Sequence, residues 1–433
     1  MRNKQIITII ALLTITVNVN NAQKLVNSPY ARFNLGNLNS SGTFRSLAMG
    51  GTGVAMRSNN SIYFVNAASY TSIDTTSFVF EFGLDYSTAS LDDGENSYKS
   101  GDLNFNHLLM GFPIGKRIGL ALGITSFSNG YYYISDVITS GDPEYDPLVG
   151  DVYSTHKGTG SISDYFIGTG IDITRNLSLG ANMIVSLGEI RRLNQYEFDD
   201  YEYTFSQLSS EDLKLSSVRF DYGMQYTQPF KNDFFITAGL SYSMKSKYKS
   251  SLERSKQRFA VYDAAPYSPD TLAYSYVTTG DSSSFPSAIK AGLVFGKKDK
   301  FVVEMNYIIT KWGEASIQGN NPGNLADTRS ALFGMEYIPD MYSNTSFLKR
   351  VEYRLGAHYS DNYLMIGDTQ LKEYGISFGL GIRMNNSYSK SSLYFDFTKR
   401  KGDIAKGMHD ENIFSIGASL NLYDFWFRKR VYY

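Results

Sequence analysis

One pentapeptide in the sequence has the spacing of a catalytic serine. Gly375, Ser377 and Gly379 fit the Gly-x-Ser-x-Gly pattern, in which a turn between a strand and a helix exposes the serine hydroxyl as a nucleophile. Here the alternation of apolar and polar residues continues through Ile382 and Met384, which predicts a strand and not a strand–turn–helix. No catalytic role is therefore expected for Ser377, and no enzyme activity is predicted.

The other residues that could do chemistry are not spaced like a working site. The four histidines have no metal-ligand spacing: His107, His156, His358 and His409. Gly51-Thr52-Gly53 lacks the third glycine and the preceding strand of a dinucleotide loop. The acidic and aromatic run at 196–203 could bind calcium, although a solvated extension of a strand is the simpler interpretation. The sequence thus predicts no metal site and no cofactor.

A two-residue rhythm runs through most of the chain, from about Phe78 to Tyr423. Between Phe301 and Ile309, for example, apolar residues alternate with a second set that includes Glu304. A period of two indicates a β-strand with one apolar and one polar face. The rhythm recurs in about fourteen segments, and bacterial outer-membrane barrels have an even number of strands. The prediction is an all-β fold, a transmembrane antiparallel β-barrel of about 14 strands over residues 74–433.

The N-terminus has the features of a signal peptide. Arg2 and Lys4 precede an apolar run at 6–17, which is too short to span a bilayer. Cleavage after Ala22 makes residues 1–22 the predicted signal peptide, and an uncleaved anchor is the alternative. The sequence has no cysteines, so an exported chain of this kind would be stabilised by a closed hydrogen-bond ladder. The net charge of −1 indicates no nucleic-acid partner.

Long and short connections alternate along the predicted strands. The join at 113–116 is short, whereas those at 129–160, 195–210 and 250–284 are long and polar. Short turns belong at the periplasmic rim and long loops outside the cell. The first strand is therefore expected to start, and the last to end, in the periplasm.

Many charged residues fall on the face of the predicted strands that alternates with the apolar one. They include Glu81, Asp85, Asp164, Asp172, Asp221, Lys290, Glu304, Glu336, Arg354, Arg383 and Asp396. An Arg or Lys that faces lipid at mid-bilayer costs about 2–4 kcal/mol, so this face is predicted to line the lumen. The other face is predicted to contact outer-membrane lipid. Leu293→Arg is accordingly expected to damage assembly, and Gly292→Arg to be better tolerated.

Residues 23–73 lack the alternation of the strands. The stretch 46–56 is small, apolar and rich in glycine, and 62–70 is again apolar. This apolar content argues against a disordered tail, and glycines that recur on the charged face of the strands leave room in the lumen. Residues 23–73 are therefore predicted to be an N-terminal plug, or hatch, in the lumen.

The run Arg45-Ser46-Leu47-Ala48-Met49-Gly50-Gly51-Thr52-Gly53 resembles the plug signature of the FadL/TodX family of outer-membrane transporters. Asn59-Asn60 and Asn66-Ala67-Ala68 follow it. In that family an alanine-methionine-glycine-glycine run leads to an asparagine-proline-alanine motif. The chain departs from the pattern in having Ala67 in place of the proline and Asn59-Asn60 where an acidic pair is common. These departures bear on the backbone shape near Ala67 and on transport.

The resemblance implies passive uptake of hydrophobic small molecules, such as long-chain fatty acids, across the cell outer membrane of a Gram-negative bacterium. It implies that the plug residues help to form the ligand site: Met49, Gly50, Gly51, Asn66, Ala67 and Ala68. It also implies a lateral opening in the third strand, where Ser128, Asn129 and Gly130 interrupt the apolar pattern. An ordinary strand end at the outer rim is the alternative for these three residues.

Two other functions stay open at this point. Relatives of the family can serve as structural or accessory barrels in a larger envelope complex, with other envelope proteins as partners. A general polar porin is the third option. Stable co-purification with other envelope proteins would favour the accessory role, and ion conductance would favour the porin.

Overall fold

The computed structural model describes residues 28–92, 97–198, 206–259, 261–262, 265–266, 270–317, 325–384, 389–406 and 408–425. The predicted signal peptide at 1–22, the start of the predicted plug at 23–27, and 199–203 of the acidic run lie outside the described residues.

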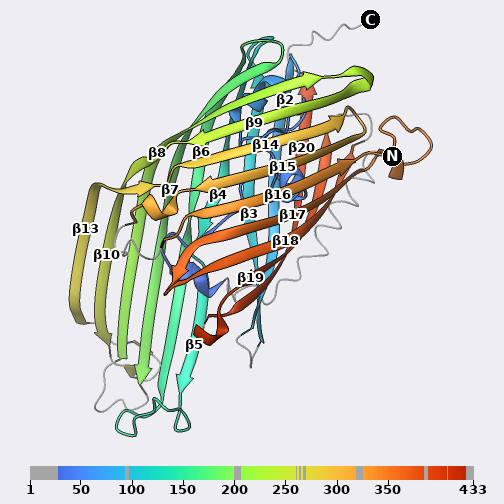
Figure 1. Cartoon of the computed structure of the whole chain (residues 1–433). Helices are drawn as coiled ribbons and strands as arrows, with labels where there is room; N and C mark the ends of the chain where they lie inside the picture. Colours follow the sequence, from blue (N-terminus) through green and yellow to red (C-terminus); the bar gives the residue numbers. More distant parts are fainter. Residues whose placement is uncertain are drawn as a thin grey trace, which may run out of the picture.

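Antiparallel strands make up most of the described chain (Figure 1). The strands are β1 (Asn37–Leu38), β2 (Ser77–Asp92), β3 (Ser97–Pro113), β4 (Ile118–Asn129), β5 (Tyr132–Ile138), β6 (Val152–Asp172), β7 (Leu177–Phe198), β8 (Ser206–Pro229), β9 (Phe234–Ser243), β10 (Ser246–Phe259), β11 (Val261–Tyr262), β12 (Ala265–Pro266), β13 (Asp270–Phe285), β14 (Ala288–Lys297), β15 (Phe301–Thr310), β16 (Thr328–Tyr337), β17 (Glu352–Ile366), β18 (Thr369–Arg383), β19 (Lys390–Lys401) and β20 (Asp410–Phe425).

The helical segments of the described chain are all short. They are η1 (Pro29–Arg32), α2 (Phe44–Leu47), η2 (Ala67–Ser72), η3 (Lys231–Asp233), η4 (Trp312–Glu314), η6 (Leu348–Arg350) and η7 (Ile404–Lys406). Within the described ranges, none of the helices has the length and apolar character needed to cross a bilayer.

The strands close into one barrel. β20 returns to pair with β2, from Ser77 opposite Phe425 to Asp92 opposite Asp410. Three positions around the barrel are each occupied by two strands in line: β4 with β5 against β6, β9 with β10 against β8, and β14 with β13 against β9 and β10. Counted in this way the barrel has fourteen strands, and the predicted fold class is confirmed.

The two faces of the barrel wall differ as the alternation predicts. Leu293 and Met305 are 56% and 60% exposed on the outer surface, whereas Glu304 and Glu336 are 0% and 3% exposed on the inner one. Apolar side chains therefore cover the surface that would meet lipid, and the charges lie in the lumen, where they can be paired. The predicted assignment of the faces is confirmed.

Several strands are longer than a membrane requires. β7 has 22 residues and β8 has 24, whereas a membrane-spanning strand needs about 9–11. Figure 1 shows β5, β6, β7, β8, β10 and β13 continuing past the other strands at one end. The prediction of long loops at 129–160 and 250–284 is therefore wrong for most of these residues. Outside the membrane neither face has to be apolar, so the hydrophobic alternation stops while the ladder continues.

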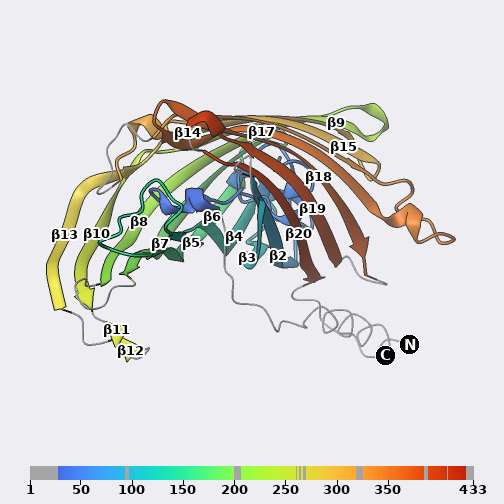
Figure 2. The same cartoon turned by 90° about the horizontal axis from the view of Figure 1, so that it is seen from below.

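The described N-terminal segment, residues 28–73, lies inside the ring of strands (Figure 2, blue). We call the end of the barrel with the short turns, such as 172–177, the inner end and the opposite end the outer end. Ser28 is hydrogen-bonded to Glu411 at the outer end. η2 packs against Gly119 and Gly180 near the inner end. The segment therefore runs along the lumen from the outer end to the inner end.

The N-terminal segment occupies the space beside glycines that face the lumen. Gly292 faces the lumen, but a Cβ there would lie 2.4 Å from Oδ1 of Asn306 and 3.0 Å from Cβ of Val54. An arginine at Gly292 would therefore have to displace Asn306 and Val54, and its better tolerance relative to Leu293→Arg stays a prediction.

Candidate functional site

A tight turn after α2 fastens the N-terminal segment to the wall. Gly50 (φ +70°) and Gly51 (φ +81°) both have left-handed backbone conformations, which glycine adopts without strain. The Gly51 N–H donates to the Ser46 carbonyl (3.0 Å), and the Gly50 N–H donates to Oγ of Ser377 on β18 (2.9 Å). Met49 is buried in an apolar cluster beside them. The serine of the Gly-x-Ser-x-Gly pattern thus holds the turn in place.

The wall carries glycines where this turn approaches it. A Cβ at Gly356 on β17 would lie 1.9 Å from the Gly50 nitrogen, and a Cβ at Gly334 on β16 would lie 2.4 Å from the Met49 oxygen. Any side chain at either position would collide with backbone atoms. These two glycines therefore allow the segment and the wall to meet at backbone distance.

Asn66 joins three parts of the chain. Its Nδ2 donates to the carbonyls of Val54 (2.8 Å), Met224 on β8 (3.2 Å) and Leu240 on β9 (3.2 Å). Its Oδ1 accepts from the Ala68 N–H (3.1 Å) at the start of η2. The side chain is fully buried, so every one of these bonds replaces water. The structure thus gives the asparagine of the predicted motif a clamping role.

Ala67 takes the first position of η2, where a proline is well tolerated. Asn66 before it is extended (φ −140°, ψ 106°), as a residue that precedes a proline must be. The Ala67 carbonyl packs on the wall, since a Cβ at Gly180 would lie 2.7 Å from its oxygen. The backbone at Ala67 therefore has the shape that a proline would take, and Ala68 beside it is fully buried.

A row of alternating charges connects the segment to three strands. Arg45 of α2 binds Glu336 through two nitrogens, at 2.9 and 2.7 Å. Arg354 donates to Glu336 at 2.8 Å and to Glu352, and Lys390 donates to Glu352 at 2.6 Å. Burial alone would lower the pKa of Arg45, but the Glu336 carboxylate raises that pKa well above its ordinary value. The charges are thus paired in a buried row.

Arg57 makes a second polar anchor near the inner end. Its guanidinium donates to Ser178 (2.8 Å), Thr71 (2.7 Å) and Gln225 (3.2 Å), and lies 3.8 Å from Asp172. Burial lowers the pKa of Arg57, and the nearby Asp172 opposes that shift. These contacts hold the part of the N-terminal segment near the inner end against β7 and β8.

A cavity of about 370 Å³ lies in the lumen beside the segment. One side is aromatic and contains Phe127, Phe285 and Trp312. The last two belong to a buried apolar cluster between the cavity and the outer end, together with Tyr248, Tyr363 and other residues. An apolar molecule could lose its water against this side.

The side of the cavity next to these rings is charged. Arg219 is ion-paired with Asp164, and its guanidinium lies 4.9 Å from the centre of the Phe127 ring. Lys290 lies 3.9 Å from Asp221. The cavity therefore has an aromatic side and an ionic side, which is the distribution that a molecule with one apolar and one polar end requires.

The ladder between β3 and β4 ends before the strands do. Their pairing runs outward as far as His107 opposite Thr125. Beyond that point the edge of β4 pairs with β1 of the N-terminal segment, with Leu38 opposite Ser128. The cavity reaches this place, because Asn106 of β3 is among its lining residues.

The three residues predicted at a lateral opening lie at this place. Ser128 is fully buried, and its hydroxyl has no hydrogen-bond partner among the residues that the structure describes. Nδ2 of Asn129 donates to Asn39 of the N-terminal segment (3.3 Å). The Gly130 N–H donates to the Gly160 carbonyl of β6 (2.9 Å). They form the junction of β4 and β5.

Some residues of the site were missed in the sequence. Arg219 follows the strand alternation and would have been found by extending the set of lumen charges. Trp312 and Asn106 lie where no period is visible, and β1 is only two residues long. Over the described part of the chain, no group of three His, Asp or Glu residues could hold a metal ion.

Comparison with known proteins places the fold. A family model described as BamG matches residues 1–433, and no curated protein matches the sequence. The CymD monoaromatic hydrocarbon channel has a TM-score of 0.58 and 14% identity, with 92% of this chain and 100% of that chain covered. The toluene transporter TodX of Pseudomonas putida has a TM-score of 0.57 and 16% identity, with 90% of this chain and 99% of that chain covered.

A FadL homologue of Pseudomonas aeruginosa is similar to the same degree. Its TM-score is 0.55 at 14% identity, with 90% of this chain and 98% of that chain covered. At such identities the likeness is one of fold. The predicted resemblance to the FadL/TodX transporters is confirmed at that level, and the chain is an outer-membrane-type barrel.

Proposed function

The chain belongs to the BamG family, and we propose that it lies in the outer membrane of a Gram-negative bacterium and passively admits a hydrophobic molecule with one polar end. The observation that carries the proposal is the cavity of about 370 Å³ with an aromatic side and an ionic side. The structurally similar CymD and TodX are described as a hydrocarbon channel and a toluene transporter, which supports an apolar ligand.

The two sides of the cavity would act on different parts of the ligand. Phe127, Phe285 and Trp312 would cover the apolar body and exclude water from it. The polar end would form hydrogen bonds with the ion-paired groups of Arg219 and Asp164 and of Lys290 and Asp221. A long-chain fatty acid has both parts, and it is the ligand that we favour.

The end of the β3–β4 ladder offers the ligand an exit. The cavity touches Asn106 on one side of this place and Ser126 on the other. We propose that the ligand leaves sideways here, past Ser128, Asn129 and Gly130, when β1 separates from β4. The motif residues of the segment, from Met49 to Ala68, would hold the rest of the plug still during this step.

Native mass spectrometry of the protein purified in a detergent without fatty-acyl chains tests the proposal. We expect a bound amphiphile, and we expect Arg219→Gln to reduce its occupancy. Arg191→Gln is the matched control, because Arg191 has a side chain that is 51% exposed and lies on the outer extension of β7. Absence of any bound amphiphile, together with unaltered hydrophobic-compound uptake in a deletion strain, would refute uptake.

A second function, an accessory barrel of a larger envelope complex, is favoured by a separate observation. The outer extension of β7 and β8 exceeds what the membrane requires, and residues 271–277 of β13 are exposed at consecutive positions, on both faces. Such a projecting strand can hold a partner protein. Stable co-purification of other envelope proteins, lost on deleting 271–277, would support this role. A barrel that always runs alone would argue against it.

A further inference from the structure

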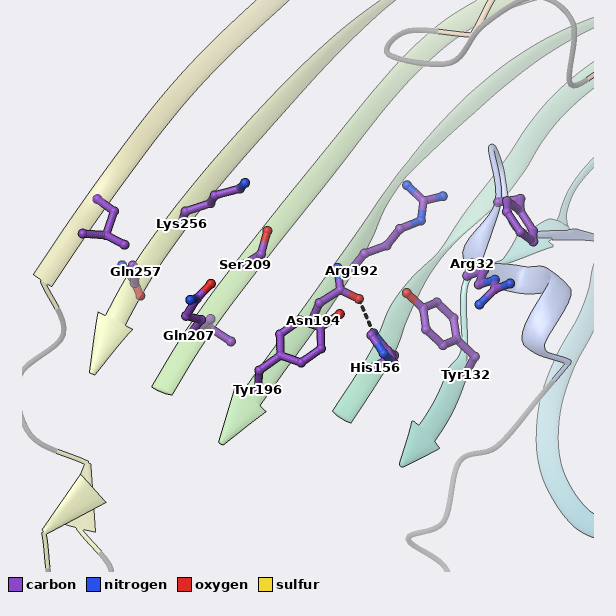
Figure 3. Close-up of a pocket in the computed structure, with 13 residues that line it drawn as sticks. Arg32, Tyr132, His156, Arg192, Asn194, Tyr196, Gln207, Ser209, Lys256 and Gln257 are labelled. Carbon is purple, nitrogen blue, oxygen red and sulfur yellow. Dashed lines mark hydrogen bonds between the residues drawn. The ribbon is translucent and has the colours of Figure 1, made fainter. Parts of the chain in front are cut away.

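A second cavity, of about 510 Å³, lies at the outer end of the barrel. Figure 3 shows the side chains of neighbouring strands around it, with Arg32 of the N-terminal segment next to Tyr132 of β5. The strands are β5, β6, β7, β8, β10 and β13. We call this space the outer cavity, and it shares no lining residue with the lumen cavity.

The outer cavity has an excess of positive charge. Arg32, Arg192 and Lys256 line it, and no carboxylate of the described chain does. Arg192 is partly neutralised by Glu211, at 2.8 Å. Arg32 and Lys256 form no ion pair with any carboxylate in the described ranges. Two cations are therefore available to an anionic ligand.

Arg192 is buried in the wall of the outer cavity. The residue is only 8% exposed. One terminal nitrogen binds Glu211 and the other binds the Asn34 carbonyl, whereas Nε has no partner among the described residues. Nε is itself enclosed by protein, so Arg192 adds positive charge to the cavity wall.

The remaining lining residues match the chemistry of a sugar. Asn194 and Gln207 offer amide groups, which can donate to and accept from hydroxyls, and Nδ1 of His156 is held by Asn194 Oδ1 at 2.7 Å. Tyr196, which is 38% exposed, offers a ring surface for the apolar face of a pyranose. The cavity has the size of a small-molecule pocket, which is about 300–1,000 Å³. A flat protein partner would fit it poorly.

We propose that the outer cavity binds a sugar that carries a phosphate or carboxylate group. One of the two unpaired cations, Arg32 or Lys256, contacts the anion, and the amides contact the hydroxyls. The sugar belongs either to a glycolipid of the outer leaflet or to a free saccharide, and both present the same chemistry to the site. This activity is independent of ligand passage through the lumen.

Calorimetry on the full chain in detergent micelles tests the site with glucose 6-phosphate as the probe. Glucose 6-phosphate should bind, and the Arg32→Ser/Lys256→Ser double variant should weaken its binding by at least about tenfold, because charge-assisted hydrogen bonds are lost. Added salt should weaken it too. Lys249→Ser is the matched control, since Lys249 lies on the same strand as Lys256 and is exposed on the opposite face. Lys256→Arg should retain binding.

The outcomes separate the proposal from simpler explanations. Equal binding by the double variant, or no binding of glucose 6-phosphate and none of lipopolysaccharide, would overturn it. Binding of inorganic phosphate as tightly as glucose 6-phosphate would also overturn it, because the sugar would then contribute nothing. Nanodiscs with lipopolysaccharide, compared with nanodiscs of phosphatidylglycerol alone, identify the source. Selective retention on the former indicates a glycolipid, and binding of only the free probe indicates a soluble saccharide.

Discussion

Replacing Gly356 with alanine should loosen the N-terminal segment from the barrel wall. The new Cβ would lie 1.9 Å from the Gly50 nitrogen and 2.3 Å from the Met49 carbonyl carbon, whereas ordinary contact begins at 3.4 Å. The segment would have to move by about 1.5 Å, which takes the Gly50 N–H away from Ser377. Overpacking costs about 1–3 kcal/mol, and the lost hydrogen bond adds about 0.5–1.5 kcal/mol, because the Gly50 N–H keeps the Leu47 carbonyl as an acceptor at 3.1 Å.

Conductance in planar lipid bilayers and limited trypsin digestion measure this loosening. Gly356→Ala should show open states that the unaltered chain lacks, and trypsin should cleave the segment at Arg45 and Arg57. Gly115→Ala is the matched control, because a Cβ at Gly115 meets no atom within 4 Å. Unchanged conductance and trypsin resistance in folded Gly356→Ala would show that the segment does not seal the barrel as these contacts imply.

Three further changes test separate parts of the structure. Arg45→Met should lower the free energy of unfolding in urea by about 3–5 kcal/mol, because it leaves the buried Glu336 carboxylate with fewer partners. Arg191→Met, at an exposed ion pair, should change the free energy of unfolding by less than about 1 kcal/mol. Equal effects of the two changes would contradict the buried row of charges. Ala67→Pro should leave the free energy of unfolding unchanged or raise it by up to about 1 kcal/mol, because the backbone already suits proline. A loss of more than about 1 kcal/mol would show that the proline ring clashes with the wall. Leu293→Arg should reduce the folded fraction in membrane extracts, because an arginine on the lipid face costs about 2–4 kcal/mol. Leu148→Arg, at a loop position that is 86% exposed, should leave the folded fraction unchanged. Similar losses in both variants would refute the assignment of the faces.

The membrane part of the barrel could be predicted from the sequence for a physical reason. Lipid on one side and a wet lumen on the other force strict alternation, as at Leu293 and its neighbours. That constraint disappears beyond the membrane, where β10 and β13 continue as a ladder with exposed residues on both faces. The sequence pattern therefore indicates loops where the structure has strands.

The contents of the lumen were predictable only in part. The residue types of the motif, such as Gly50 and Asn66, indicated a tight turn and a polar contact. Their partners could not be predicted, because Ser377 is 327 residues from Gly50 in the chain. The same limit applies to Arg45, whose partner Glu336 is 291 residues away. Contacts of such range follow from the closure of the barrel and leave no local signal.

The course of the N-terminal segment along the lumen sets an order for folding. Ser28 is bound at the outer end and Ser77 starts β2 at the inner end, so the segment passes through the whole ring. It is bonded to the wall along its length, at Glu411, Glu336 and Ser178. The final step is therefore expected to be the zipping of β20 to β2 around a segment that is already seated. The segment would then act as the core around which the barrel closes.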